Sequence, residues 1–208
     1  MATSMHQTIE LLMRLFSDPP PSQPADFAFM FGQTVDNQHS VLQRACELLN
    51  EGRVKKVGFM QAPPLSGYPG FAAWQQILSA QGIKPDQMEG VPFSNTDIIH
   101  TGIEAEAMVH HVRQKDYQCV YVLSAPFQQL RAFMNAVTLA VQHYPELQLY
   151  SMPGLPLPWQ EEVMHSQGKV SGTRIALIGS ELERIATYMA KGDLGSVELA
   201  LDYLNRRG

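Results

Sequence analysis

The stretch Cys-Val-Tyr-Val-Leu-Ser-Ala-Pro-Phe-Gln-Gln-Leu-Arg, residues 119–131, decides the fold. Its first five residues are apolar without interruption, which is typical of a strand buried on both faces of a parallel sheet. From residue 126 onward, apolar side chains recur instead at helical spacing: Phe127, Leu130, Met134, Val137 and Val141. Pro126 fits the first turn of such a helix, because its missing N–H would have no partner there. The stretch therefore predicts a buried strand followed at once by a helix.

The same alternation continues on both sides of this stretch. Short apolar runs predict further strands at residues 27–31, 54–60, 88–93 and 147–151. Helical spacing predicts helices that end near Gly52 and Gly82, and another over residues 100–115. Strands that alternate with helices indicate an α/β fold, in which a mostly parallel sheet of four or five strands is covered on both faces as a three-layer sandwich.

Further helices are expected at the two ends of the chain. Residues 1–24 predict a leading helix, with Ile9, Leu12, Met13 and Phe16 as its apolar positions, followed by a proline-rich connector. The remaining residues, 25–208, are expected to form one domain, with the sheet core at 25–151 and a lid loop and C-terminal helices at 152–208.

The segment after residue 174 has the composition of a strand but the spacing of a helix. Its apolar residues recur at offsets of 3, 4, 3 and 4, at Ile175, Ile178, Leu182, Ile185 and Met189. This periodicity predicts a helix that packs on the domain through Ile178, Leu182 and Ile185. Ser196 can N-cap a last helix that buries Val197, Ala200, Leu201 and Leu204.

Composition excludes several classes of protein. The chain has 208 residues, of which 45% are hydrophobic and 17% charged, so it folds rather than staying disordered. A net charge of −5 with scattered basic residues argues against binding to nucleic acid. Two cysteines, Cys46 and Cys119, are too few for a disulfide framework, which suits a cytoplasmic protein. No apolar stretch reaches 18 residues, so no membrane span is expected.

Ligands of open parallel sheets bind beyond the carboxyl ends of the strands, which localises the search for a site. Gly32, Gln33 and Asn37 follow the first strand, and Ser124, Gln128 and Arg131 follow the strand at 119–123. Gly32 either lets the backbone approach a ligand or serves a simple turn. Arg131 either holds an anion, together with backbone N–H groups near Gly32 and Pro126, or pairs with a carboxylate of the protein.

Polar residues near the helix at 100–115 form a second group of candidates. Glu104 is the best candidate for an acid or base or for binding a hydroxyl or amine, whereas Glu106 only favours the helix dipole. The histidines lack a tight metal-ligand spacing, so no metal is expected and His110 and His111 are interpreted as solvent-facing. His165-Ser-Gln-Gly168 lies in a proline-rich segment that either closes over the strand ends as a lid or only links sheet to helix.

Several short motifs, in this order, resemble the YdcF-like family, a bacterial domain of unknown function. They are Asp26-Phe-Ala-Phe-Met-Phe-Gly32, Arg44, Asn95-Thr96 with Glu104-Ala105, Ser124-Ala-Pro-Phe-Gln-Gln-Leu-Arg131, His165-Ser-Gln-Gly168 and Tyr188-Met-Ala-Lys-Gly-Asp193. The resemblance runs from about Asp26 to the C-terminus. It implies a Rossmann-like fold and, as in some relatives, binding of S-adenosylmethionine or a nucleotide-like ligand.

The chain departs from this family's pattern at three points. Met60-Gln61-Ala62 replaces a glycine pair, Gln128 stands where relatives often carry a histidine, and Ala105 replaces an asparagine. A histidine that could serve as general base is therefore missing, which favours ligand binding over catalysis.

These patterns give three hypotheses for function. The first is a small-molecule-binding protein for S-adenosylmethionine or a nucleotide-like metabolite. The second is a hydrolase or transferase on a phosphorylated or adenosine-type metabolite, with Glu104 as acid or base and Arg131 as anion holder. The third is a scaffold with a vestigial cleft, whose loop over residues 152–172 binds another protein. The predicted ligand contacts are Gly32, Gln33, Asn37, Asn95, Thr96, His100, Thr101, Glu104, Ser124, Gln128, Arg131 and His165.

Overall fold

A five-stranded, all-parallel sheet forms the centre of the molecule, as a computed structural model that describes residues 5–92, 97–165 and 169–208 shows. The strands lie in the order β3-β2-β1-β4-β5. Their bounds are Ala25–Met30 for β1, Val54–Met60 for β2, Met88–Val91 for β3, Cys119–Ser124 for β4 and Gln148–Pro153 for β5. The predicted α/β sandwich with a parallel sheet is confirmed.

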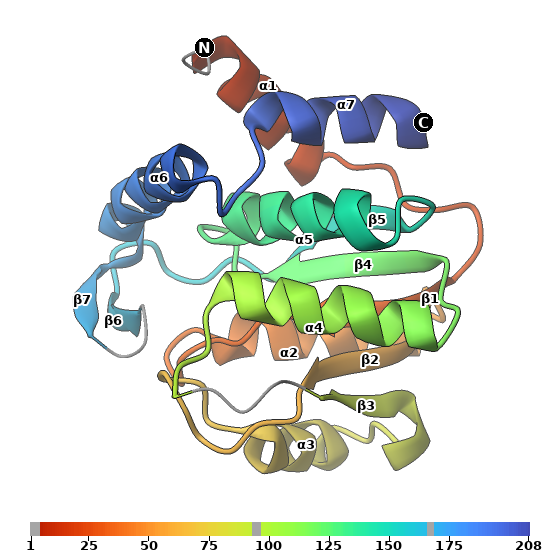
Figure 1. The fold of residues 1–208 in the computed structure, drawn as a ribbon. Helices are drawn as coiled ribbons and strands as arrows, with labels where there is room; N and C mark the ends of the chain where they lie inside the picture. Colours follow the sequence, from red (N-terminus) through yellow and green to blue (C-terminus); the bar gives the residue numbers. More distant parts are fainter. Residues whose placement is uncertain (1–4, 93–96, 166–168) are drawn as a thin grey trace.

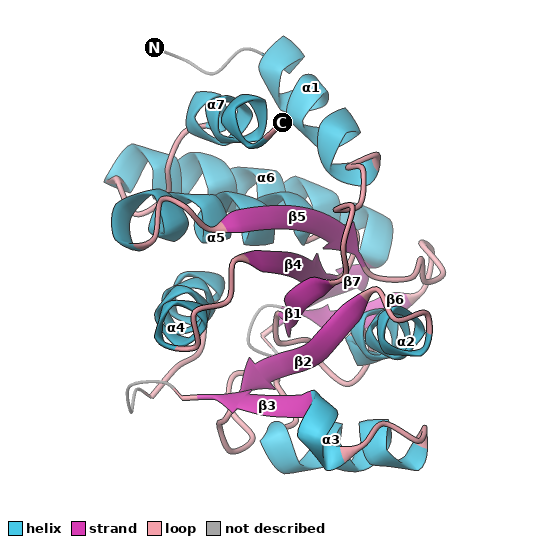
Figure 2. Cartoon of the chain, turned by 90° about the vertical axis from the view of Figure 1, so that its right-hand side faces the viewer, coloured by secondary structure: helices cyan, strands magenta, loops and turns pink. Residues whose placement is uncertain are grey.

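Helices cover both faces of the sheet (Figures 1 and 2). α4 (Thr101–Gln114) and α5 (Gln129–His143) lie on one face, and α2 (Gln38–Asn50) and α3 (Phe71–Ala80) lie on the other. A short 3-10 turn, η1 (Pro85–Gln87), precedes β3. The chain builds β1, β2 and β3 outward and then returns to place β4 beside β1. The order of strands therefore reverses between β1 and β4, which is where such sheets bind ligands.

Several predicted boundaries differ from the structure, and β1 and β5 are displaced by one or two residues from the predicted 27–31 and 147–151. β3 ends at Val91, and residue 93 lies outside the described residues. α5 begins at Gln129 rather than in the turn that contains Pro126, because residues 126–128 form a separate turn before the helix. The N–H groups that the sequence assigned to a helix start at Pro126 thus lie one turn further along.

The first and last helices meet at the β5 edge of the sheet, where α1 (Met5–Phe16) packs beside α7 (Val197–Arg207) (Figure 1). Asp18, in the connector after α1, forms a buried ion pair with Arg207 and accepts the N–H of Ser151 at 2.7 Å. The Tyr203 hydroxyl accepts the N–H of Leu149 at 2.6 Å. These side chains thus accept hydrogen bonds from backbone N–H groups on the outer edge of β5, which would otherwise be unpaired.

α6 (Arg174–Lys191) confirms the predicted helix, but of the three residues predicted to pack on the domain only Ile185 is buried. Ile175, Ile178 and Leu182 remain exposed, and the side chains that α6 buries are Arg174, Leu177, Glu181 and Ile185. The inner side of α6 carries two charged residues instead: Arg174 pairs with Glu161, and Glu181 pairs with the buried Arg131. α1 shows the same shift, since it buries Leu11 and Leu15 and leaves Ile9, Met13 and Phe16 exposed.

The predicted lid loop contains a two-stranded antiparallel hairpin that the sequence did not indicate. Its strands are β6 (Glu162–His165) and β7 (Val170–Thr173). Thr34 Oγ1, just after β1, donates to the carbonyl of Met164 at 2.7 Å. The hairpin therefore lies at the carboxyl end of β1 (left in Figure 1). No helix in the described part of the chain is long and apolar enough to cross a membrane.

The sheet requires a glycine at position 58. A Cβ built on Gly58, in β2, would lie 2.0 Å from Cζ of Phe27, a fully buried ring in β1. We expect Gly58→Ala to lower the free energy of unfolding by about 1–3 kcal/mol through overpacking. Gly179→Ala, on the exposed side of α6 with no atom within 4 Å of its Cβ, should raise it by roughly 0.5–1 kcal/mol. Urea unfolding of both variants tests this, and equal effects would contradict it.

Candidate functional site

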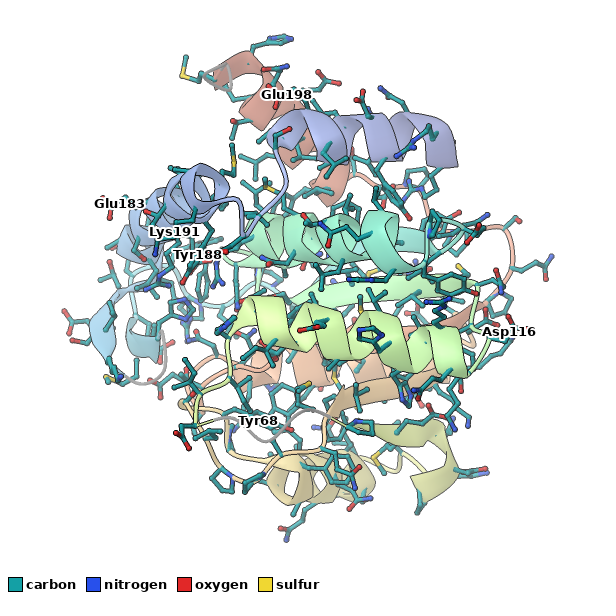
Figure 3. All side chains as sticks on the ribbon, in the orientation of Figure 1. Tyr68, Asp116, Glu183, Tyr188, Lys191 and Glu198 are labelled. Carbon is teal, nitrogen blue, oxygen red and sulfur yellow. The ribbon has the colours of Figure 1, made fainter. Side chains whose placement is uncertain are left out.

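A polar cavity of about 80 Å³ lies beyond the carboxyl ends of β1 and β4, at the reversal of strand order. We call it the cleft. In Figure 3, Tyr188 on α6 and Tyr68 on the loop after β2 mark its upper and lower sides. The residues that line it are Gly32, Gln33, Thr34, Leu65, Ser66, Tyr68, Ile99, His100, Thr101, Glu104, Gln128, Arg131, His165, Arg184 and Tyr188.

The buried carboxylate of Glu181, on α6, accepts hydrogen bonds from three residues that line the cleft. It accepts from Arg131 Nε at 2.6 Å, from His165 Nε2 at 2.9 Å and from Arg184 Nη1 at 2.6 Å. Burial would raise the pKa of Glu181, but the charge of Arg131 and the hydrogen bonds from His165 and Arg131 lower it to about 2. Glu181 is therefore ionised, and it fixes α5, the hairpin and α6 relative to one another.

A second buried carboxyl, Glu104 on α4, reaches back to the turn after β1. Its Oε1 accepts the N–H of Gly32 at 2.6 Å, and the side chain is 3% exposed. Burial raises the pKa of Glu104 to about 7, against the opposing effects of the Gly32 N–H and the charge of Arg131. A carboxyl that titrates near neutral pH in a cavity can both accept and donate a proton.

Amide side chains form the floor of the cleft between these two carboxyls. Gln33 Nε2 donates to Gln128 Oε1 at 2.8 Å and to the carbonyl of Phe31 at 3.1 Å. The Oε1 atom of Gln33 is buried and has no hydrogen-bond partner among the described residues. Gln128 in turn donates to Thr101 Oγ1 at 3.4 Å. An unpaired buried acceptor costs free energy, which a ligand or water that donates to it would recover.

Eight of the predicted ligand contacts line the cleft, and two do not. Ser124 is fully buried beneath Gln33, and Asn37 is fully buried in contacts with Thr34, Arg174 and the Met164 carbonyl, so both have structural roles. Asn95 and Thr96 lie outside the described residues. The eight that line it are Gly32, Gln33, His100, Thr101, Glu104, Gln128, Arg131 and His165.

The predicted anion cradle of Gly32 and Arg131 is already occupied by the protein. The Gly32 N–H donates to Glu104, and Arg131 directs Nε and Nη2 at the carboxylate of Glu181. Arg131 also donates to Thr101 and is 7% exposed. The alternative interpretation, pairing with a carboxylate of the protein, is therefore the correct one for Arg131.

Sequence reasoning missed the contribution of α6, which supplies Glu181, Arg184 and Tyr188. These residues recur at offsets of 3 and 4, so they share one helical face. Applying helical periodicity to the polar residues, and not only to the apolar ones, would have found them. Arg184 is 21% exposed and its only recorded side-chain partner in the described chain is Glu181, so other guanidinium N–H groups remain free.

Comparison of the chain with family models, with curated proteins and with solved structures finds no match. The interpretation of the histidines as solvent-facing is wrong for His111 and His165, which are buried against the carboxylates of Glu89 and Glu181. Across the part of the chain that the structure describes, no three histidine, cysteine, aspartate or glutamate residues come together as a metal site would require. The geometry of the cleft therefore carries the functional argument.

We expect Glu181→Gln to destabilise the fold, because it leaves two guanidinium groups without their buried carboxylate. Removing one partner of a buried ion pair costs roughly 3–5 kcal/mol. Glu183→Gln is the matched control, since Glu183 is exposed on the outer side of α6 (Figure 3) and should change stability by less than about 0.5 kcal/mol. Urea unfolding at neutral pH gives both values. A small loss for Glu181→Gln would show that the network does not hold the elements together.

Glu104 should make stability depend on pH. Its pKa is about 7 in the folded chain and about 4.3 when unfolded, so its contribution is complete below pH 4 and is lost as pH rises through 7. Glu104→Gln keeps an acceptor for Gly32 but does not titrate. Relative to this variant, we expect the wild type to lose up to roughly 3 kcal/mol between pH 4 and pH 8. Parallel pH profiles in urea unfolding would refute the prediction.

Proposed function

We propose that this protein binds, in the cleft, the phosphate or carboxylate group of a small metabolite of the nucleotide or S-adenosylmethionine type. The observation that carries the proposal is the guanidinium of Arg184, which lines the cavity and has N–H groups without a partner among the described residues. Arginine offers paired donors that suit a phosphate or carboxylate.

The charge balance of the cleft also favours an anion. Arg131 and Arg184 contribute two positive charges, against one full negative charge on Glu181. Glu104 is partly protonated near neutral pH, because its pKa is about 7. The charged groups around an anion at Arg184 would therefore be positive in sum, because Glu104 carries only part of a negative charge.

The size of the cleft limits which part of the ligand it takes. Cavities that enclose a whole organic ligand usually have volumes of about 300–1,000 Å³, whereas the cleft measures about 80 Å³. It would hold a phosphate or carboxylate group, and the rest of the ligand would extend beyond it. We include in this proposal that the chain is related to the YdcF-like family. We also include a cytoplasmic location, with which the free cysteines Cys46 and Cys119 are consistent.

A second candidate function is catalysis, and the observation that favours it is Glu104. A buried carboxyl with a pKa near 7 beside a site for an anion can act as general acid or base in hydrolysis or group transfer. Loss of turnover in Glu104→Gln with unchanged ligand affinity would support an enzyme on a phosphorylated or adenosine-type metabolite.

The ligand should be found by a thermal-shift screen of inorganic phosphate, nucleotides, S-adenosylmethionine and S-adenosylhomocysteine. A ligand at about 100 times its dissociation constant stabilises the fold by roughly 2.7 kcal/mol. For a ligand so found, we expect Arg184→Ala to weaken binding by about 30- to 150-fold in calorimetry, the value of one charge-assisted contact of about 2–3 kcal/mol. Arg206→Ala, which removes an exposed arginine on α7, should leave affinity unchanged. Equal affinities for both variants would place the anion elsewhere.

A further inference from the structure

A second cavity adjoins the cleft at the other side of Tyr188. It measures about 430 Å³ and lies between α4, α5 and the end of α6. His100, Arg131 and Tyr188 line both cavities and so form their shared boundary. The two cavities are therefore neighbouring parts of one continuous surface, and a ligand too long for the cleft has this direction in which to extend.

The second cavity is lined by side chains that can donate hydrogen bonds, His100, Arg131, Gln142 and His143, and by three that offer oxygen acceptors, Asn135, Glu106 and Asp193. Asn135 on α5 is 7% exposed; its Nδ2 donates to the Arg131 carbonyl at 2.8 Å, and its Oδ1 has no hydrogen-bond partner among the described residues. The carboxylates of Glu106 and Asp193 line the same cavity. Arg131 stands at the boundary, but its charge is paired with Glu181. Asn135 Oδ1 and the carboxylates of Glu106 and Asp193 can accept hydrogen bonds from an amine, which carries positive charge at neutral pH.

Gly102, which lines this cavity, leaves room beside His100 and Asn135. A Cβ on Gly102 would lie 3.2 Å from Cε1 of His100 and 3.5 Å from Oδ1 of Asn135. Any side chain at this position would therefore intrude beside the unpaired oxygen. Alanine would also suit the helix better than glycine, so helix stability does not account for Gly102.

The rise of α6 gives an approximate scale for the distance between the two subsites. Arg184 lies by the cleft, and Lys191 ends the helix just before Asp193. Seven residues of helix at 1.5 Å per residue separate these points by roughly 10 Å. Tyr188 lies midway, with Lys191 Nζ 5.8 Å from its ring centroid (Figure 3).

We propose that the cavity lined by Asn135 and Asp193 is a second subsite, which binds an amino group on the ligand whose anionic end occupies the cleft. This inference rests on the proposed function, because the anion at Arg184 orients the ligand. It narrows the ligand class to metabolites that carry an anionic group and an amine roughly 10 Å apart. Ile103 and Leu139, which also line the cavity, would contact the carbon skeleton between them.

Two synthetic probes of equal chain length test the inference, aminohexyl phosphate and hexyl phosphate. Both carry the anion, and only the first carries an amine. By calorimetry at neutral pH, we expect the wild type to bind aminohexyl phosphate about tenfold more tightly, which corresponds to about 1.4 kcal/mol. Asp193→Asn and Asn135→Leu should each reduce this preference to roughly twofold without changing the affinity for hexyl phosphate. Asp193 is exposed, so its variant should fold even if Asn135→Leu does not.

The controls separate the two subsites. Arg184→Ala should weaken both probes alike, and Glu183→Gln, on the outer side of α6, should change neither. Equal affinity of the wild type for the two probes, or a preference that survives Asp193→Asn and any folded Asn135→Leu, overturns the second subsite and leaves the anion site standing. Failure of both esters to bind overturns the proposed anion site and the second subsite together.

Discussion

The buried carboxylate of Glu181 is the interaction on which the arrangement of the candidate site depends. One side chain accepts hydrogen bonds from α5, from the hairpin and from its own helix. A charge so far from solvent is tolerated only because these donors surround it. The same requirement rotates α6, so that its ionic side faces inward and Ile178 and Leu182 face solvent.

Two buried carboxyls at the cleft, Glu181 and Glu104, have pKa values shifted in opposite directions. Glu181 stays ionised because arginine and histidine neutralise it, whereas Glu104 has a single backbone N–H and a pKa near 7. One carboxylate is therefore fixed and structural, and the other is free to change its protonation state. Polar groups whose environments separate their pKa values in this way are typical of sites where protons are bound and released.

Eight of the ligand contacts predicted from the sequence do line the cleft, because they follow strands or begin helices at the carboxyl edge. Their partners were not predictable in the same way. Whether Arg131 faces a ligand or Glu181 depends on contacts across 50 residues of chain, and no local spacing records them. Ser124 and Asn37 follow strands as well, yet neighbouring side chains cover them completely.

The sequence by itself determined the five strands, the helices between them and the edge of the sheet where polar residues gather, because apolar periodicity and turn residues act over a few neighbouring positions. Only the tertiary structure decided which face of α1 and α6 is buried, that residues 162–165 pair with residues 170–173, and that Arg184 and Tyr188 join the cleft. These outcomes depend on ion pairs and backbone hydrogen bonds between distant segments, such as Glu181 with Arg131 and Thr34 with Met164. These interactions stabilise the fold only once the sheet has brought those segments together.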